Sequence, residues 1–223
     1  MRKTVSLAIA AATMLAANIG FAAPLSDYSA GKTAIDLTFR NTDVADKGPG
    51  YDISFDKKNN MDWGITTGLG NKFAVQYNGY NAKTKDTYVE QFGISGKGEL
   101  KNQELNVLYK IDDNVSAYMG VVQSKWTISD DSSGSSSTDN KNKIQFGLIG
   151  STKIADKTTV YASFAAGSDL TNWKVGLSQE IAPNIDLNVD YRSLKVKNLT
   201  GNDFTDKVDI AAKGLGLGVT YKF

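Results

Sequence analysis

Apolar and polar residues alternate one by one along most of the chain after residue 30, and the alternation is most regular at its end. From Leu215 to Phe223, every odd position is apolar or aromatic and every even position is glycine, threonine or lysine. A period of two is typical of a β-strand with one apolar face and one small or polar face. The end of the chain is therefore predicted to be a strand that turns one face toward an apolar environment.

The same alternation recurs in about ten segments, which predicts an all-β protein of about ten antiparallel strands. Eight or twelve strands are alternatives. Tyr51–Leu69 is interpreted as one long strand whose polar middle bulges, but a turn at Asp56–Asn60 would change the count. An even number is required if both termini lie on the same side of a membrane.

Connections between these segments are of two kinds. Four short polar turns are centred near residues 71, 113, 156 and 183. The other connections are predicted to be polar loops, at Asn41–Gly50, Ala82–Leu100, Thr127–Asn142 and Leu194–Asp206, with a brief one at Gly167–Thr171. Short turns on one side and longer loops on the other are the asymmetry of outer-membrane β-barrels, whose long loops face the cell exterior.

Residues 1–22 have the composition of a secretory signal peptide. Two basic residues precede an apolar run that ends at Ile19, and cleavage after Ala22 leaves small residues at the positions that a signal peptidase reads. An uncleaved anchor is the alternative, but the run is short for a membrane span of about 20 residues. Residues 23–223 are therefore predicted to form a single exported domain.

A secreted β-sandwich also alternates with a period of two, so the position of the charges matters. One face of the strands is nearly free of charge at membrane depth, and the other carries charges of both signs. The charged face is predicted to line the lumen of a transmembrane antiparallel up-and-down β-barrel with both termini in the periplasm. The candidate lumen-lining residues are Asp36, Arg40, Glu104, Lys110, Lys174, Glu180, Asp190 and Arg192.

The last five residues, Val219-Thr220-Tyr221-Lys222-Phe223, resemble the sorting signal that the outer-membrane assembly machinery reads in bacterial barrel proteins, with Tyr221 and Phe223 as its aromatic residues. In its pattern, the whole chain after the signal is similar to small porin-like barrels that lack a peptidoglycan-binding domain. The resemblance implies insertion into the bacterial outer membrane by that machinery. It implies no particular substrate.

Aromatic side chains are expected on the outer wall near both rims of the apolar band. The candidates are Phe39, Tyr51, Trp173 and Tyr191 at one rim, and Phe73, Tyr109, Tyr221 and Phe223 at the other. Inward glycines at 214, 216 and 218 are expected to make room for bulky side chains such as Tyr118 or Tyr161. The expected partners are outer-membrane lipid and lipopolysaccharide, and a monomer is predicted.

The composition argues against several functions. The sequence has no histidine, whereas the barrel enzymes (lipid A deacylases, palmitoyl transferases, phospholipases and omptin proteases) use one in proton transfer, so no enzyme is predicted. Without cysteine there is no thiolate metal site or disulfide, and neither a metal nor a cofactor is predicted. Loss of the signal changes the net charge from +1 to −1, which disfavours nucleic-acid binding.

Buried charges must be paired or hydrated, and this leaves two functions open. A narrow porin-like pore for passive passage of ions or small solutes is slightly favoured, because glycine and serine on the inner face leave some space. The alternative is a non-conducting structural or adhesive barrel that acts through its extracellular loops. A barrel of about eight strands is filled by side chains, and ten strands lie close to that size.

Overall fold

The computed structural model describes residues 25, 27–90, 93–130, 134–202, 204 and 206–223, so the predicted signal peptide lies outside the described residues. The described part contains twelve strands and no helix. The strands are β1 (Thr33–Gly48), β2 (Tyr51–Gly70), β3 (Phe73–Lys83), β4 (Thr87–Val89), β5 (Ile94–Lys110), β6 (Val115–Asp130), β7 (Gly134–Ser137), β8 (Lys141–Ala155), β9 (Thr158–Gly167), β10 (Leu170–Ala182), β11 (Ile185–Leu199) and β12 (Val208–Lys222).

Ten of these strands close into one antiparallel barrel, which confirms the predicted fold class and strand number. The order around the wall is β1-β2-β3-β5-β6-β8-β9-β10-β11-β12, and β12 pairs again with β1. The short strands β4 and β7 add to β5 and β6. Within the described residues, no helix has the length and apolarity of a membrane span.

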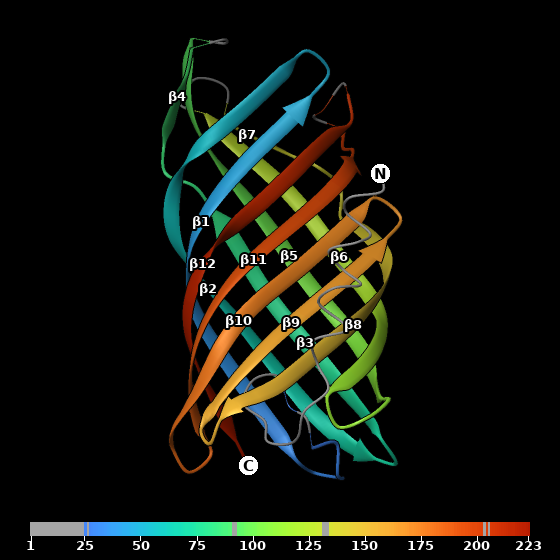
Figure 1. Ribbon diagram of the computed structural model, residues 1–223. Coiled ribbons are helices and arrows are strands. Elements are labelled where there is room, and N and C mark those ends of the chain that lie inside the picture. Colours follow the sequence, from blue (N-terminus) through green and yellow to red (C-terminus); the bar gives the residue numbers. More distant parts are fainter. Residues whose placement is uncertain (1–24, 26, 91–92, 131–133, 203, 205) are drawn as a thin grey trace, which may run out of the picture.

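The barrel has two unlike ends, and its strands are strongly tilted (Figure 1). The C-terminus lies at the lower end in that view, with the tight turns, and we call this the turn end. The four predicted short turns are confirmed there, between β2 and β3, β5 and β6, β8 and β9, and β10 and β11. Asn71, Lys72 and Asn184 have φ values of 51°, 70° and 67°, as tight hairpin turns require.

The opposite end, which we call the loop end, is built largely of strand where loops were predicted. β1 continues to Gly48 through the predicted loop at Asn41–Gly50, and β6 continues to Asp130. β5 and β11 likewise extend into predicted loops. The prediction was wrong because backbone pairing with neighbouring strands holds these polar segments extended, whatever their side chains.

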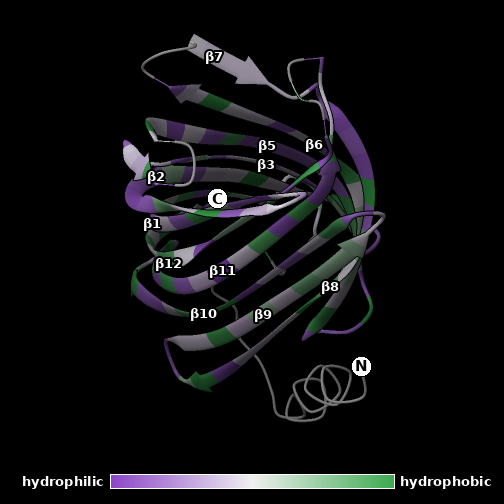
Figure 2. Ribbon diagram, turned by 90° about the horizontal axis from the view of Figure 1, so that it is seen from above, coloured by the Kyte–Doolittle hydropathy of each residue, from purple (hydrophilic) through white to green (hydrophobic). Residues whose placement is uncertain are grey.

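In these segments the apolar residues lie on the inward face and the polar residues on the outward face. This is the opposite of a membrane strand, which explains why the segments did not look like one. In the turn-end half of β12, Leu215 and Leu217 are exposed on the outer wall, and the buried inward positions hold glycine and Thr220. In the loop-end half, Val208 and Ile210 are buried inside and charged residues face out. Figure 2 shows polar and apolar residues alternating along the long strands of the barrel. Each strand therefore changes from a membrane pattern to a water-soluble pattern along its length.

The polar middle of β2 bulges, as the one-strand interpretation allowed. The register against β1 shifts between Thr42 and Val44, so Val44 pairs with Phe55 while Thr42 pairs with Lys58. Phe55 and Trp63 are both at odd positions of β2, but because of the shift Phe55 faces the lumen while Trp63 lies on the outer wall. Tyr51 was therefore wrongly predicted as an outer rim residue, since it packs against buried apolar residues inside the loop end.

The other predicted rim aromatics lie on the outer wall or beside it. Phe39 is 65% exposed, and Trp173 and Tyr191 contact each other with ring centroids 5.5 Å apart. At the turn end Phe73 and Tyr109 form a similar pair at 5.1 Å, and Tyr221 stacks on Phe223 at 5.6 Å. These rings bound an exposed apolar band of the kind that faces lipid in membrane barrels.

Candidate functional site: the barrel lumen

The lumen holds three layers of side chains, stacked from the turn end to the loop end. A small apolar layer closes the turn end, a charged layer lies in the middle, and a large apolar layer fills the loop end. Each layer draws residues from strands on several sides of the barrel. The lumen is therefore built as an interior with its own packing, and each layer is described in turn.

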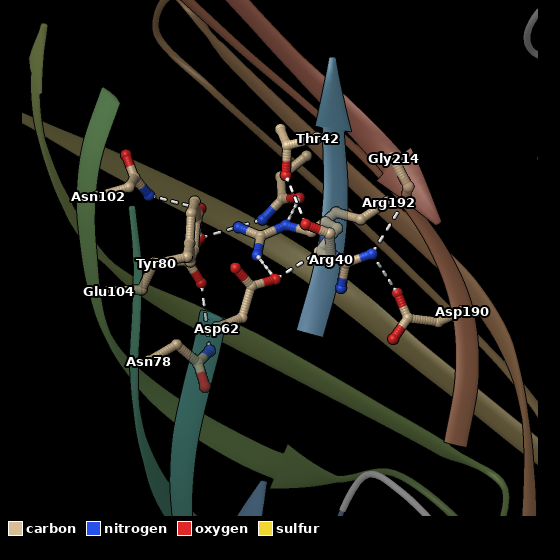
Figure 3. Close-up of polar contacts among 11 residues, drawn as sticks. Arg40, Thr42, Asp62, Asn78, Tyr80, Asn102, Glu104, Asp190, Arg192 and Gly214 are labelled. Atoms are coloured by element: carbon tan, nitrogen blue, oxygen red, sulfur yellow. Dashed lines mark hydrogen bonds and ion pairs between the residues drawn. The ribbon is translucent and has the colours of Figure 1, made fainter. Parts of the chain in front are cut away.

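Arg40 is the centre of the charged layer. Its Nε lies 2.7 Å from Asp62 Oδ2, its Nη1 lies 2.7 Å from Asp190 Oδ1, and Nη1 also donates to the Gly214 carbonyl at 3.0 Å. Figure 3 shows the guanidinium group held between the two carboxylates. The side chains are only 6%, 14% and 3% exposed for Arg40, Asp62 and Asp190. Burial is tolerated because every charge meets an opposite one.

Arg192 continues the layer across the barrel. Its guanidinium carbon lies 3.2 Å from the centre of the Tyr80 ring, and its Nη1 lies 3.5 Å from Asp62. Arg192 is on β11 and Tyr80 on β3, so the contact crosses the lumen past β12, β1 and β2. Figure 3 shows this stacking. A cation over an aromatic face is attractive and is stronger when both groups are desolvated.

Glu104 makes a second set of contacts across the lumen. It accepts hydrogen bonds on Oε1 from the Tyr80 hydroxyl at 2.6 Å and from Asn172 Nδ2 at 3.0 Å. Glu104 is on β5 and Asn172 on β10, with β6, β8 and β9 between them along the wall. The Tyr80 hydroxyl accepts in turn from Asn102, which accepts from Ser124. The charged layer is thus one connected network rather than separate pairs.

A cavity of about 100 Å³ lies inside this network. Six of the eight predicted lumen-lining residues surround it: Asp36, Arg40, Glu104, Lys174, Asp190 and Arg192. The Lys174 ammonium is 5.5 Å from the Tyr161 ring centre, and no described carboxylate lies within 4 Å of it. Arg192 Nη2 and Asn188 Oδ1 are buried without a described hydrogen-bond partner. The size and polarity of the cavity suit a few water molecules.

The two other predicted residues lie away from the cavity, near the turn end. Lys110 is at the end of β5, where its ammonium lies 2.9 Å from an Asp113 oxygen. A hydrogen bond and charge attraction from Lys110 lower the pKa of Asp113, which lies in the exposed turn. Glu180 is near the end of β10, where its backbone N–H donates to the Lys157 carbonyl. Neither residue joins the central network.

The large apolar layer fills the loop end of the lumen. Trp126 is fully buried at its centre, with its ring 5.8 Å from that of Phe55 in an edge-on contact. The Trp126 indole N–H donates to Asp46 Oδ2 at 2.9 Å, from β6 to β1 across the barrel. The remaining members are Val44, Ile53, Tyr80, Ala82, Leu100, Val122, Leu170, Leu194, Val196, Leu199, Val208, Ile210 and Ala212. This layer is packed like the core of a soluble domain.

The segment before β1 closes the turn end. Leu25 and Tyr28 are 5% and 3% exposed and pack on Leu108 and Ile149. The Tyr28 hydroxyl donates to Ser116 Oγ at 3.0 Å, and the Tyr28 carbonyl accepts from the Gly70 N–H at 2.8 Å. The sequence offered no pattern that predicts this, since a short leader contains too few residues to show periodicity.

Some inward residues were missed, and some glycines act differently from the prediction. Asp62 and Tyr80 each alternate with exposed neighbours on the same strand. This alternation could have predicted that both side chains face inward. Tyr118 lies over Gly147 and Tyr161 over Gly176, where a Cβ would come within 2.4 and 2.5 Å of the rings. The expected room at positions 214–218 serves Arg40 instead, whose Nη1 is 2.9 Å from the Cβ position of residue 216.

The described residues contain no group of three or more histidine, cysteine or acidic side chains placed to hold a metal ion. Acidic side chains of the central layer are engaged by arginine, threonine or amide groups. Asp62 and Asp190 are thus held by buried ion pairs, and Asp36 and Glu104 by neutral hydrogen-bond donors.

A closed antiparallel barrel with an exposed apolar band and a polar centre defines a transmembrane β-barrel. The family model of the outer membrane protein beta-barrel domain matches residues 7–223, and the chain belongs to that family. The family places the protein in the bacterial outer membrane. The comparison with curated proteins found no relative.

Several solved structures are similar. The outer membrane protease OmpT from Escherichia coli is 12% identical, with a TM-score of 0.57 over 92% of this chain and 99% of that one. Ail, the attachment invasion locus protein of Yersinia pestis, is 18% identical (TM-score 0.41; 86% and 99% covered). The toluene transporter TbuX of Ralstonia pickettii is 8% identical (TM-score 0.41; 87% and 89% covered). Likeness at these identities concerns the fold alone.

Proposed function

We propose that the protein is a non-conducting outer-membrane barrel whose lumen is filled by its own side chains, and that it acts through the strands and loops beyond its apolar band. The observation that carries the proposal is the stack of contacts that cross the lumen. Tyr28 closes the turn end, Glu104 and Asn172 bridge the middle, and Trp126 reaches Asp46 at the loop end. A passing ion would have to open all three layers.

The energetics support a closed lumen. Arg40 holds two carboxylates in a site with little exposure, and leaving one member of such a pair buried without its partner costs about 3–5 kcal/mol. The apolar layer adds a second barrier, because an ion leaving water for an apolar interior loses its hydration. The proposal assigns no catalytic role, in keeping with the absence of histidine.

A narrow porin-like pore is the second candidate, and one observation favours it. The central cavity has polar walls, and Lys174 has no described carboxylate within 4 Å. Such a cavity could hold an ion in transit if the layers on both sides moved apart. Under either function, we also propose cleavage after Ala22, insertion by the outer-membrane assembly machinery and a monomer surrounded by outer-membrane lipid and lipopolysaccharide.

Single-channel recording in a planar bilayer tests the closed lumen. The refolded chain starting at Ala23 is added at known density, and folding is checked by the heat-dependent shift in gel mobility. We expect no discrete conductance steps from the folded protein. Steady steps that change when Asp190 is replaced by asparagine, but not when exposed Asp52 is, would overturn the closed lumen in favour of the pore.

A further inference from the structure

The carboxyl group of Asp46 is buried inside the large apolar layer at the loop end. The residue is only 2% exposed, and its register partners on the two neighbouring strands, Ile210 and Ile53, are buried members of that layer. Asp46 lies beyond the lipid-facing band, because Asp43, which precedes it on β1, already meets Lys213 of β12 on the outer wall at 3.8 Å. An acidic side chain is thus enclosed by apolar residues outside the membrane-spanning part of the barrel.

Two neutral donors hold this carboxyl group. The Trp126 indole N–H donates to Oδ2 of Asp46 at 2.9 Å, and the Tyr51 hydroxyl donates to Oδ1 at 3.3 Å. No described lysine or arginine nitrogen lies within 4 Å of the carboxyl oxygens. Asp62 and Asp190 differ in this respect, since arginine holds both. The ionised form of Asp46 would therefore be a buried charge without a counter-ion.

The charged groups around the carboxyl do not favour its ionised form. The charged or titratable groups on the surrounding stretches of strand are Asp43 and Lys47 of β1, Tyr51, Asp52 and Asp56 of β2, Lys97 and Glu99 of β5, Lys125 of β6, Lys195 of β11, and Asp206, Lys207 and Asp209 in or just before β12. Lys47 is engaged by Asp52, and Lys195 by Asp209 at 3.8 Å. Burial raises the pKa of Asp46 to about 6, against the lowering effect of its two hydrogen bonds, and the charge of Asp209 adds to the rise.

Both donors are fixed in place by close packing against glycine. A Cβ at Gly98 of β5 would lie 2.0 Å from the Trp126 ring, and a Cβ at Gly48 would lie 2.3 Å from the Tyr51 ring. The two rings cover the carboxyl oxygens from two sides of the barrel. A carboxylate needs more donors than these two, and water reaches it only if one of the rings moves.

We propose that Asp46 is a pH switch of the loop-end apolar layer: the layer stays dry and holds Trp126 while the carboxyl is neutral, and it loosens and admits water when the carboxyl is charged. The folded layer binds the proton more tightly than the unfolded chain does. The stability contributed by the neutral carboxyl is therefore complete below about pH 4 and is lost as the pH rises through about 6. Because the loop end faces the cell exterior in outer-membrane barrels, the switch would respond to external pH.

Trp126 can report on the layer by itself. The sequence has three tryptophans, and the other two, Trp63 and Trp173, lie exposed on the outer wall and can be replaced by phenylalanine. This reporter chain, starting at Ala23, is refolded in phosphatidylcholine vesicles, and acrylamide quenching of Trp126 is measured from about pH 4.5 to about pH 8.5. We expect the quenching constant to rise about threefold or more, with a midpoint near pH 6.

Two variants of the reporter chain separate the switch from a general effect of pH. Asp46→Asn keeps an acceptor for the indole but cannot ionise, so its quenching is expected to stay at the low-pH value throughout. The matched control, Asp52→Asn, removes a carboxyl that is 57% exposed on the adjacent strand and is expected to keep both the rise and its midpoint. Folding of each chain is checked by the heat-dependent shift in gel mobility.

Either of two results would overturn the switch: quenching of Trp126 that does not change with pH, or the same rise in Asp46→Asn. The first result requires no change at Asp46, so the proposal can be refuted even if that variant does not fold. The switch concerns the loop-end layer alone and does not depend on whether the central layer conducts. Discrete conductance steps together with pH-dependent quenching would therefore reject the closed lumen and support the switch.

Discussion

Replacing Arg40 by glutamine separates a packed lumen from a hydrated one. Arg40 contacts Asp62 and Asp190 at 2.7 Å each, and the three side chains are at most 14% exposed. The substitution removes the charge and leaves a shorter polar side chain. Asp62 retains Arg192 at 3.5 Å, but Asp190 loses its only described ion pair. The consequence falls mainly on one buried carboxylate.

The structure sets the size of the effect. Removing one partner of a buried pair costs about 3–5 kcal/mol, because an uncompensated charge stays behind. Since Asp62 keeps a partner, we expect the lower part of that range, about 3 kcal/mol in the free energy of unfolding. The exposed pair of Lys47 and Asp52, whose side chains are 50% and 57% exposed, sets the comparison. Lys47→Gln is expected to cost less than about 1 kcal/mol.

Urea unfolding in phospholipid vesicles, followed by tryptophan fluorescence, measures these values. The double variant Arg40→Gln with Asp190→Asn tests the cause, because it removes both charges of one pair. We expect it to be at least about 1 kcal/mol more stable than the sum of the single changes predicts. A loss under about 1 kcal/mol for Arg40→Gln, equal to that of Lys47→Gln, would refute the packed interior and indicate a water-filled lumen.

Three other predictions concern the wall, the apolar layer and the end of the chain. Leu217→Arg places a charge in the middle of the lipid-facing band and is expected to cost about 2–4 kcal/mol in the same unfolding assay; a neutral result would contradict the outward register of β12. Trp126→Ala empties the centre of the apolar layer and is expected to cost about 3–5 kcal/mol, unlike the partly exposed Trp173→Ala; equal costs would contradict a packed layer. Deletion of Phe223 is expected to lower the amount of folded protein in the outer membrane, measured by immunoblot of membrane fractions; normal levels would contradict its role in sorting.

The sequence predicted the membrane half of the barrel well. Its alternation is strict, and its turns are short and carry residues such as Asn71 and Asn184 that adopt positive φ. These are local properties, set by neighbouring residues and by the apolar surroundings. The strand number and the four turns followed from them, and the structure places six of the eight proposed inward charges around one cavity.

The contacts within the lumen were less predictable, because they join residues far apart in the chain. Nothing near Trp126 in the sequence indicates that its indole reaches Asp46, and nothing near Arg192 indicates the Tyr80 ring. The bulge in β2 reversed the face of Phe55 and Tyr51, which alternation alone cannot detect. The leader residue Tyr28 closes the turn end through a hydroxyl contact that leaves no periodic trace.

The change in polarity of the outward residues along each strand indicates where the lipid band ends. In β5, Lys101 faces out beside the buried Leu100, whereas Leu105 faces out beside the buried Glu104. Outward apolar residues are stable only against lipid, and outward charges only in water or headgroups. The position where outward residues change from apolar to charged therefore marks the edge of the lipid band on each strand. In β12 this edge falls between Leu215 and Lys213, and in β6 between Val121 and Lys125. This edge can be found in the sequence, because there the apolar residues move from one set of alternate positions to the other. A long polar segment that follows a membrane strand should therefore be tested for such a change before it is interpreted as a loop.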